Sequence, residues 1–238
     1  MKKGFTLAEI LITLAIVGIL ASLTIPTLVS SNQKKVWANS LAKAVNTISN
    51  SLSLMISKDG SYGLTDSSLW KDVINGTDLK DALVEHLGKT MVITDGSYNV
   101  VPKTLYGEEK PGLLSDYVRL TTKGNITYFL LIGKDAEVIH NFNYNEWVAD
   151  VIIDVNGEEI PNTIGKDIFG FLITDEGRLI PYGEPGLGRP SEAIKITSAG
   201  NTSRYMSNWE YFCPDSSKRY DGFPCAAKVV AEGYKINY

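Results

Sequence analysis

The sequence has few of the residues from which enzyme active sites are most often built. Its 238 residues include two histidines, His86 and His140, which we interpret as a helix-end and a strand residue. It contains no serine-hydrolase, zinc-protease or phosphate-loop signature, and the glycines of residues 183–188 lack the strand-to-helix context of a phosphate-binding loop. We therefore expect no enzymatic activity, no catalytic residues and no cofactor.

Excess positive charge is also missing. The chain has 23 Lys and Arg against 27 Asp and Glu, which gives a formal net charge of −4 and a pI of 5.3. Proteins that neutralise nucleic-acid phosphates present basic surfaces. The composition argues against a broad nucleic-acid surface, and we expect no nucleic-acid binding by this chain.

Charge is nearly absent from residues 5–29, where Glu9 is the only ionisable side chain. As a helix this run is about 37 Å long, enough to cross a membrane hydrocarbon core of about 30 Å. An ionised carboxylate within such a segment costs about 2.5–3.5 kcal/mol. Glu9 therefore needs a role beyond anchoring, because a leucine would anchor better.

The sequence GFTLAE at residues 4–9 resembles the processing site of type IV prepilins and type II secretion pseudopilins. The resemblance implies a leader, residues 1–4, that a membrane prepilin peptidase removes after Gly4 before methylating the new N-terminus at Phe5. It also implies that Glu9 is the family's acidic assembly residue and Pro26 its helix-bending proline. The implied partners are other pilin-like subunits, the peptidase and an inner-membrane assembly platform.

The chemistry of Glu9 supports assembly on its own. Cleavage after Gly4 places an amine at Phe5, so each subunit carries one cation and one anion in apolar surroundings. Buried charges are tolerated mainly when they are paired. If subunits stack with an axial stagger, Glu9 of one subunit meets the Phe5 amine of its neighbour, and wrong registers leave both charges unpaired.

Two simpler interpretations of the N-terminus are a secretory signal and a plain membrane anchor. A secretory signal fits poorly because the apolar region is too long, Glu9 is misplaced and no suitable cleavage site follows. A plain membrane anchor remains the alternative. With Lys2 and Lys3 before the span, the positive-inside rule predicts a cytoplasmic N-terminus and a head outside the cytoplasm. The resemblance implies a single-pass protein of the inner (cytoplasmic) membrane that later enters a filament.

The apolar segment is predicted to continue as an amphipathic helix over residues 30–57. Apolar residues recur at three- and four-residue steps, as in a helix that packs one side on a head. These residues are Val36, Trp37, Leu41, Val45, Ile48, Leu52, Met55 and Ile56. Pro26 is expected to kink or locally melt the helix near residues 22–26.

Residues 58–238 are predicted to form one globular head. Residues 77–88 indicate a short helix with Thr77 as its N-cap. Strand-like runs follow, and turn residues lie at 122–125, at Asn156-Gly157 and at 175–177. The expected strands are residues 117–121, 126–132, 136–140, 148–155, 168–173 and 178–180. The predicted fold class is α+β, with a long N-terminal helix on an antiparallel, pilin-like sheet.

The two cysteines, Cys213 and Cys225, fall in the outward head. An even count, short spacing and an oxidising compartment favour a disulfide, and two reduced thiols are the alternative. The aromatic residues nearby indicate core packing, with an adhesive or sugar-stacking face as the second interpretation. They are Trp209, Tyr211, Phe212, Tyr220 and Phe223.

Acidic and amide side chains gather at residues 154–167, where Asp154, Asn156, Glu158 and Asp167 could offer oxygens to Ca²⁺. The spacing lacks the rhythm of an EF-hand loop, so we interpret the segment as a turn whose side chains bind nearby backbone, and we assign no metal site. Calcium binding stays open.

The predicted function is that of a structural subunit, a pilin or pseudopilin polymerised through its N-terminal helix. The alternative is a minor or tip-located module that recognises a surface or a secreted substrate. The sequence does not distinguish a type IV pilus from a type II secretion pseudopilus.

Overall fold

The computed structural model describes most of the chain. The described residues are 4, 6–88, 91–94, 98–132, 148–184, 209–213 and 222–238. The strand predicted at residues 136–140, with His140, lies outside them, as do Phe5 and Tyr220.

The first element, α1 (Leu7–Asp59), is one uninterrupted helix of 53 residues. Glu9 lies in its first turn and Lys58 in its last, where each charge interacts favourably with the helix dipole. The helix continues through Pro26, so the local melting expected at residues 22–26 is not observed. A proline removes one helical hydrogen bond, and the intact bonds on either side maintain the helix. The bend assigned to Pro26 stays a prediction.

The chain divides into two compact units, Met1–Val36 and Trp37–Tyr238. In the described part of the first unit every side chain is exposed or partly exposed. The second unit contains the rest of α1, the sheet and the remaining helices.

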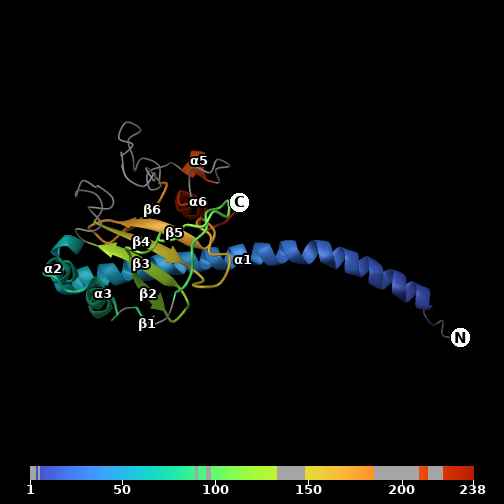
Figure 1. Cartoon of the computed structure of the whole chain (residues 1–238), viewed down its shortest axis with the longest axis horizontal. Coiled ribbons are helices and arrows are strands. Elements are labelled where there is room, and N and C mark those ends of the chain that lie inside the picture. Colours follow the sequence, from blue (N-terminus) through green and yellow to red (C-terminus); the bar gives the residue numbers. More distant parts are fainter. Residues whose placement is uncertain are drawn as a thin grey trace. The chain divides into compact units, whose positions relative to one another are not determined.

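The sheet is an antiparallel meander with spatial order β1-β2-β3-β4-β5-β6, as Figure 1 shows. Its strands are β1 (Ile93–Thr94), β2 (Val118–Thr122), β3 (Thr127–Ile132), β4 (Ala149–Asp154), β5 (Ile168–Ile173) and β6 (Leu179–Pro181). The predicted α+β architecture is confirmed, and five predicted strands match observed ones to within about one residue. The two-residue strand β1 was not predicted.

The strands β3, β4 and β5 are buried on both faces of the sheet. On one face alternate residues such as Val151 and Phe171 pack against the second half of α1. On the other face Ile152 and Leu172 pack with Tyr182 and Phe223 from the chain beyond the strands. Because both faces are covered, polar groups in the central strands must find partners inside the protein.

The second half of α1 completes the core of the head. Its buried residues are Trp37, Ala38, Leu41, Ala44, Ile48, Ser51, Leu52 and Met55. The hydroxyl of Tyr128 in β3 donates to the carbonyl oxygen of Ala44 over 3.2 Å, which ties the helix to the sheet. The predicted apolar stripe is thus confirmed in outline. Val36 was assigned wrongly, because its side chain is 61% exposed.

Shorter helices complete the fold: η1 (Leu64–Asp66), α2 (Ser68–Ile74), α3 (Leu79–Leu87), α5 (Trp209–Phe212) and α6 (Cys225–Ala231). Of these, only α3 was predicted. Its N-cap is Asp78 rather than Thr77, because the Asp78 carboxylate accepts hydrogen bonds from the backbone N–H groups of Lys80 and Asp81.

Candidate assembly site

The first half of α1 presents apolar side chains with no protein cover. Large exposed hydrophobic residues there are Leu7, Ile10, Leu11, Ile12, Leu14, Ile16, Val17, Ile19, Leu20, Leu23, Ile25, Leu28 and Val29. By length and composition α1 is the one described helix suited to cross a membrane. A surface this apolar requires lipid or other apolar helices around it.

At the start of α1, Thr6 and Glu9 form a reciprocal cap. Glu9 Oε2 accepts hydrogen bonds from the backbone N–H and the hydroxyl of Thr6, both at 2.8 Å, and the N–H of Glu9 donates to Thr6 Oγ1 at 3.3 Å. This is a capping box, in which an N-cap threonine and a glutamate three residues later satisfy each other's backbone groups. Glu9 thus has a local role in addition to the predicted one.

The role of Thr6 in this cap was not predicted. The Thr-x-x-Glu spacing just before an apolar run was the signal that could have identified it. Both contacts from Thr6 reach Oε2, and within the described residues no group donates to Glu9 Oε1. That oxygen is available to a donor from another molecule.

Gly4 lies exposed just before this cap. A Cβ atom placed on Gly4 meets nothing within 4 Å, so the fold of the subunit does not require glycine at this position. The same is true of Gly18 within the apolar segment. Any requirement for glycine at these two positions must come from contacts with another molecule.

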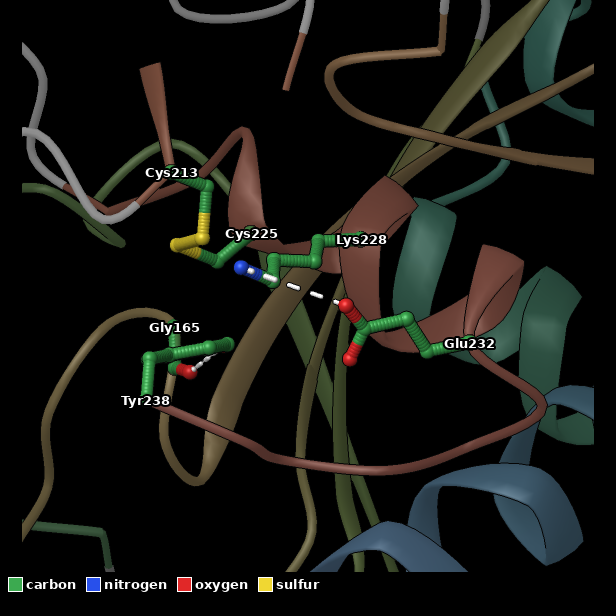
Figure 2. The surroundings of a disulfide bond; sticks show 6 residues. All are labelled: Gly165, Cys213, Cys225, Lys228, Glu232 and Tyr238. Atoms are coloured by element: carbon green, nitrogen blue, oxygen red, sulfur yellow. Dashed lines mark hydrogen bonds and ion pairs between the residues drawn. A yellow bond between two sulfur atoms is a disulfide. The ribbon is translucent and has the colours of Figure 1, made fainter. Parts of the chain in front are cut away.

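In the head, Cys213 and Cys225 form the predicted disulfide and thereby join α5 to α6 (Figure 2). Lys228 of α6 lies over the rings of Trp209 and Tyr238, with its Nζ 5.9 and 5.5 Å from their centroids. The hydroxyl of Tyr238 donates to the Gly165 carbonyl oxygen (Figure 2). These contacts hold residues 225–238 against the head.

The aromatic residues near the disulfide have different environments. Phe223 is fully buried and its ring packs edge-on against Tyr182, which supports core packing for this residue. Trp209 is partly exposed. The side chains of Tyr211 and Phe212, and all of Tyr220, lie outside the described part of the structure.

The acidic segment after β4 folds as a loop held by its own carboxylates. Asp154 Oδ1 accepts from the backbone N–H groups of Asn156 and Gly157, and Asp167 accepts from those of Asn162 and Thr163. The turn interpretation is confirmed. The hairpin predicted at Asn156-Gly157 is present, because β4 and β5 pair antiparallel, but residues 155–167 form a long connection between the two strands. The described residues hold no group of three or more His, Cys, Asp or Glu side chains suited to a metal ion.

Burial raises the pKa values of the two carboxyl groups that hold this loop. It raises the pKa of Asp154 to about 7, although the hydroxyl of Tyr98 donates to Asp154 Oδ2 at 2.8 Å. Burial likewise raises the pKa of Asp167 to about 6. A carboxyl whose pKa is higher in the folded state binds protons more tightly when folded, so it stabilises the fold at low pH and loses that effect as the pH rises through its folded pKa.

We therefore expect the head to be more resistant to urea at pH 5 than at pH 8, by roughly 2–4 kcal/mol. Replacing Asp154 by Asn keeps an acceptor for the two backbone N–H groups and removes the buried charge, so Asp154→Asn should stabilise the protein at pH 8 and flatten the pH dependence. Fluorescence of the buried Trp37 and Trp70 reports the transition. Asp66→Asn, at an exposed ion pair with Lys71, is the control and should keep the wild-type slope; an unchanged slope in Asp154→Asn would contradict the assignment.

His86 lies in a cluster of polar side chains at the end of α1 and on α2 and α3. Its Nε2 lies 2.8 Å from Asp72 Oδ2 and its Nδ1 lies 3.2 Å from Ser68 Oγ. This order of Ser, His and Asp is also found in hydrolases, but here the Ser68 hydroxyl donates to Asp59 Oδ2 at 2.5 Å. The histidine therefore cannot take that proton as a general base. The cluster instead connects α1, α2 and α3, and His86 is confirmed as a residue near a helix end.

Comparison with known proteins agrees with these features. Residues 1–25 match the family model described as the prokaryotic N-terminal methylation motif. The chain is 30% identical over 169 residues to the type IV major fimbrial protein FimA of Dichelobacter nodosus, which covers 70% of this chain and 97% of that protein. No solved structure matches the chain. The methylation motif, the apolar first half of α1 and this similarity across the head show that the chain belongs to the type IV pilin family.

Proposed function

We propose that this protein is the subunit of a type IV pilus, polymerised through the first half of α1 after a prepilin peptidase removes residues 1–4. The observation that carries the proposal is the exposed apolar half of α1, which begins at the Thr6–Glu9 cap. The similarity to a fimbrial protein supports a pilus over a secretion pseudopilus. Before assembly the apolar half spans the inner membrane, where an assembly platform extracts it. The role is mechanical, and no enzymatic step is assigned to the chain.

The Thr6–Glu9 cap fits this proposal because it fixes the carboxylate of Glu9. Oε2 is bound to Thr6 of the same subunit, and Oε1 is directed to no donor among the described residues. In a filament, the amine of Phe5 from a neighbouring subunit supplies that donor. A carboxylate already held by its own helix loses little side-chain freedom when it pairs. Wrong axial registers leave both charges unpaired, so the pair selects one register.

Processing at Gly4 tests the proposal. Gly4→Glu places a charged side chain where the subunit itself has open space, so the head and α1 should fold normally. The peptidase should no longer cleave the chain, and uncleaved precursor should accumulate in the membrane. Mass spectrometry of the wild-type filament subunit should find N-methylated Phe5 as its first residue.

Gly18→Ala is the matched control, because it also adds side-chain atoms at a glycine with open space. This variant should be cleaved as the wild type is. Assembled subunits that retain Met1, or a Gly4→Glu chain that is cleaved normally, would contradict the proposed processing.

A further inference from the structure

The face of the sheet opposite α1 carries a pocket of about 550 Å³. Its lining includes Arg119 of β2 and Phe129 of β3, which are paired in the register of the two strands. Residues 98–102, residues 112–118 and the first turn of α3 contribute the rest. The volume falls within the range of about 300–1,000 Å³ that is typical of small-molecule sites. We call this site the tyrosine pocket.

Two tyrosines that line the pocket are anchored through their hydroxyl groups. Tyr98 donates to Asp154 Oδ2 at 2.8 Å, and Tyr117 donates to Asp150 Oδ2 at 2.6 Å. Both carboxylates are fully buried on β4. The Tyr98 ring also packs edge-on against Phe129, with the ring centroids 4.9 Å apart. These contacts fix the positions of the two rings before any ligand binds.

The anchoring carboxylates lower the stability that the same positions could give. Burial raises the pKa of Asp154 to about 7. Well-packed apolar side chains in place of buried charged groups are often equally or more stabilising. Proteins depart from the most stable choice mainly at functional sites, where the side chains that contact a ligand are held by groups beneath them. We interpret Asp150 and Asp154 as such supports.

The charged side chains at the pocket are mainly cationic. Arg119 and Lys80 line it together with one carboxylate, that of Asp78. Asp78 already accepts hydrogen bonds from the backbone N–H groups of Lys80 and Asp81 at the start of α3. The chain as a whole has a net charge of −4, so two cations at one pocket run against its composition. A guanidinium such as that of Arg119 matches a carboxylate with two parallel hydrogen bonds.

We propose that the tyrosine pocket binds a carboxylated sugar, a uronic acid residue, with Arg119 on its carboxylate and the rings of Tyr98 and Tyr117 against the sugar ring. The C–H groups of a pyranose pack on aromatic side chains. Its hydroxyl groups suit a pocket whose lining is exposed to solvent at Val101 and Ser115. This binding activity of the head goes beyond the proposed function, because polymerisation through α1 does not require it.

A ligand-observed NMR titration of the full-length protein in detergent micelles tests the proposal. Methyl β-D-glucuronide should bind with a Kd of about 1 mM or tighter. Methyl β-D-glucoside has the same ring without the carboxylate, so it should bind at least about tenfold more weakly. No binding of the glucuronide, or equal binding of the two sugars, would overturn the proposal.

Variants place the binding at the tyrosine pocket. Arg119→Gln removes the cation and should weaken glucuronide binding at least about tenfold. Arg178→Gln, at an exposed arginine just before β6, is the matched control and should bind as the wild type does. Wild-type affinity in Arg119→Gln would overturn the proposal.

A second pair of variants tests the same site without removing Arg119. Ser115→Glu and Ser115→Gln add side chains of equal size at an exposed position of the lining, and only the first adds a negative charge. Ser115→Glu should bind the glucuronide about fivefold more weakly than Ser115→Gln does, because the added charge repels the ligand carboxylate. This pair decides the question if Arg119→Gln loses the cooperative melting of the wild type. Equal affinity of the two Ser115 variants would contradict the assigned site.

Discussion

Deleting residues 1–60 should abolish cooperative folding of the head, whereas deleting residues 1–31 should leave a soluble, folded monomer. The longer deletion removes the buried side of α1, which includes Trp37, Leu41, Ile48, Leu52 and Met55. At about 1.5–3 kcal/mol each, these five side chains supply roughly 8–15 kcal/mol of burial. That is comparable to the whole stability of a typical domain, about 5–15 kcal/mol. Thermal unfolding followed by circular dichroism measures the difference.

Single substitutions in the form that lacks residues 1–31 distinguish the effect of losing buried side chains from the effect of shortening the chain. Leu41 is fully buried and Val36 is 61% exposed on the same helix. Leu41→Asp should therefore abolish the cooperative unfolding transition, because an unpaired carboxylate in the core prevents the head from folding. Val36→Asp should have a melting temperature close to that of the unsubstituted form that lacks residues 1–31. Equal cooperative melting of both deletion forms would mean that α1 does not complete the core of the head.

Replacing Glu9 should nearly eliminate filaments while leaving cleavage intact. Glu9→Gln keeps a side chain that can complete the capping box but removes the charge. Glu9→Leu removes both. If Glu9 pairs with the Phe5 amine of a neighbour, either variant leaves that amine unpaired, at a cost of about 3–5 kcal/mol. Filament yield should then fall by more than about tenfold for both variants.

The control for the capping role is Thr6→Ala, which removes the hydroxyl contacts but keeps the carboxylate. It should weaken the first turn of α1 by about 1 kcal/mol and reduce assembly only slightly. Electron microscopy and quantification of sheared filaments measure all three variants. Normal assembly of Glu9→Gln, together with failure of Thr6→Ala, would assign Glu9 to capping alone and end the charge-pair hypothesis.

Local patterns predicted the long helix and the main strands well. The run at 168–173 became β5 without a shift in its bounds, and Asn125 and Gly177, with φ of 59° and 78°, occupy the turns expected beside β2 and before β6. Such elements depend on β-branched and aromatic runs and on turn residues, which neighbouring positions supply.

Long-range contacts determined what the sequence patterns missed. Asn156-Gly157 has the composition of a hairpin turn, but Asp154 and Asp167 bind the backbone of the following loop and extend the connection. Nothing local indicated that Asp150 and Asp154 are fully buried, since carboxylates are mostly exposed. Tyr117 and Tyr182 donate to Asp150 from other parts of the chain, and only the folded sheet brings them together.

The candidate site was predicted unevenly for a similar reason. Glu9 could be singled out because a lone charge in an apolar run is conspicuous in any sequence. Its partner Thr6 is an ordinary polar residue, and its role emerged from the reciprocal hydrogen bonds at the start of α1. The pairing of Glu9 between subunits cannot be read from one chain and stays a prediction.

A cryo-electron microscopy structure of filaments sheared from cells that express the full chain tests the central proposal most directly. The first halves of α1 should pack against each other, and each Glu9 Oε1 should lie within about 3.2 Å of the Phe5 amine of a neighbouring subunit. Filaments joined only through the heads, with residues 7–29 out of contact with other subunits, would contradict it.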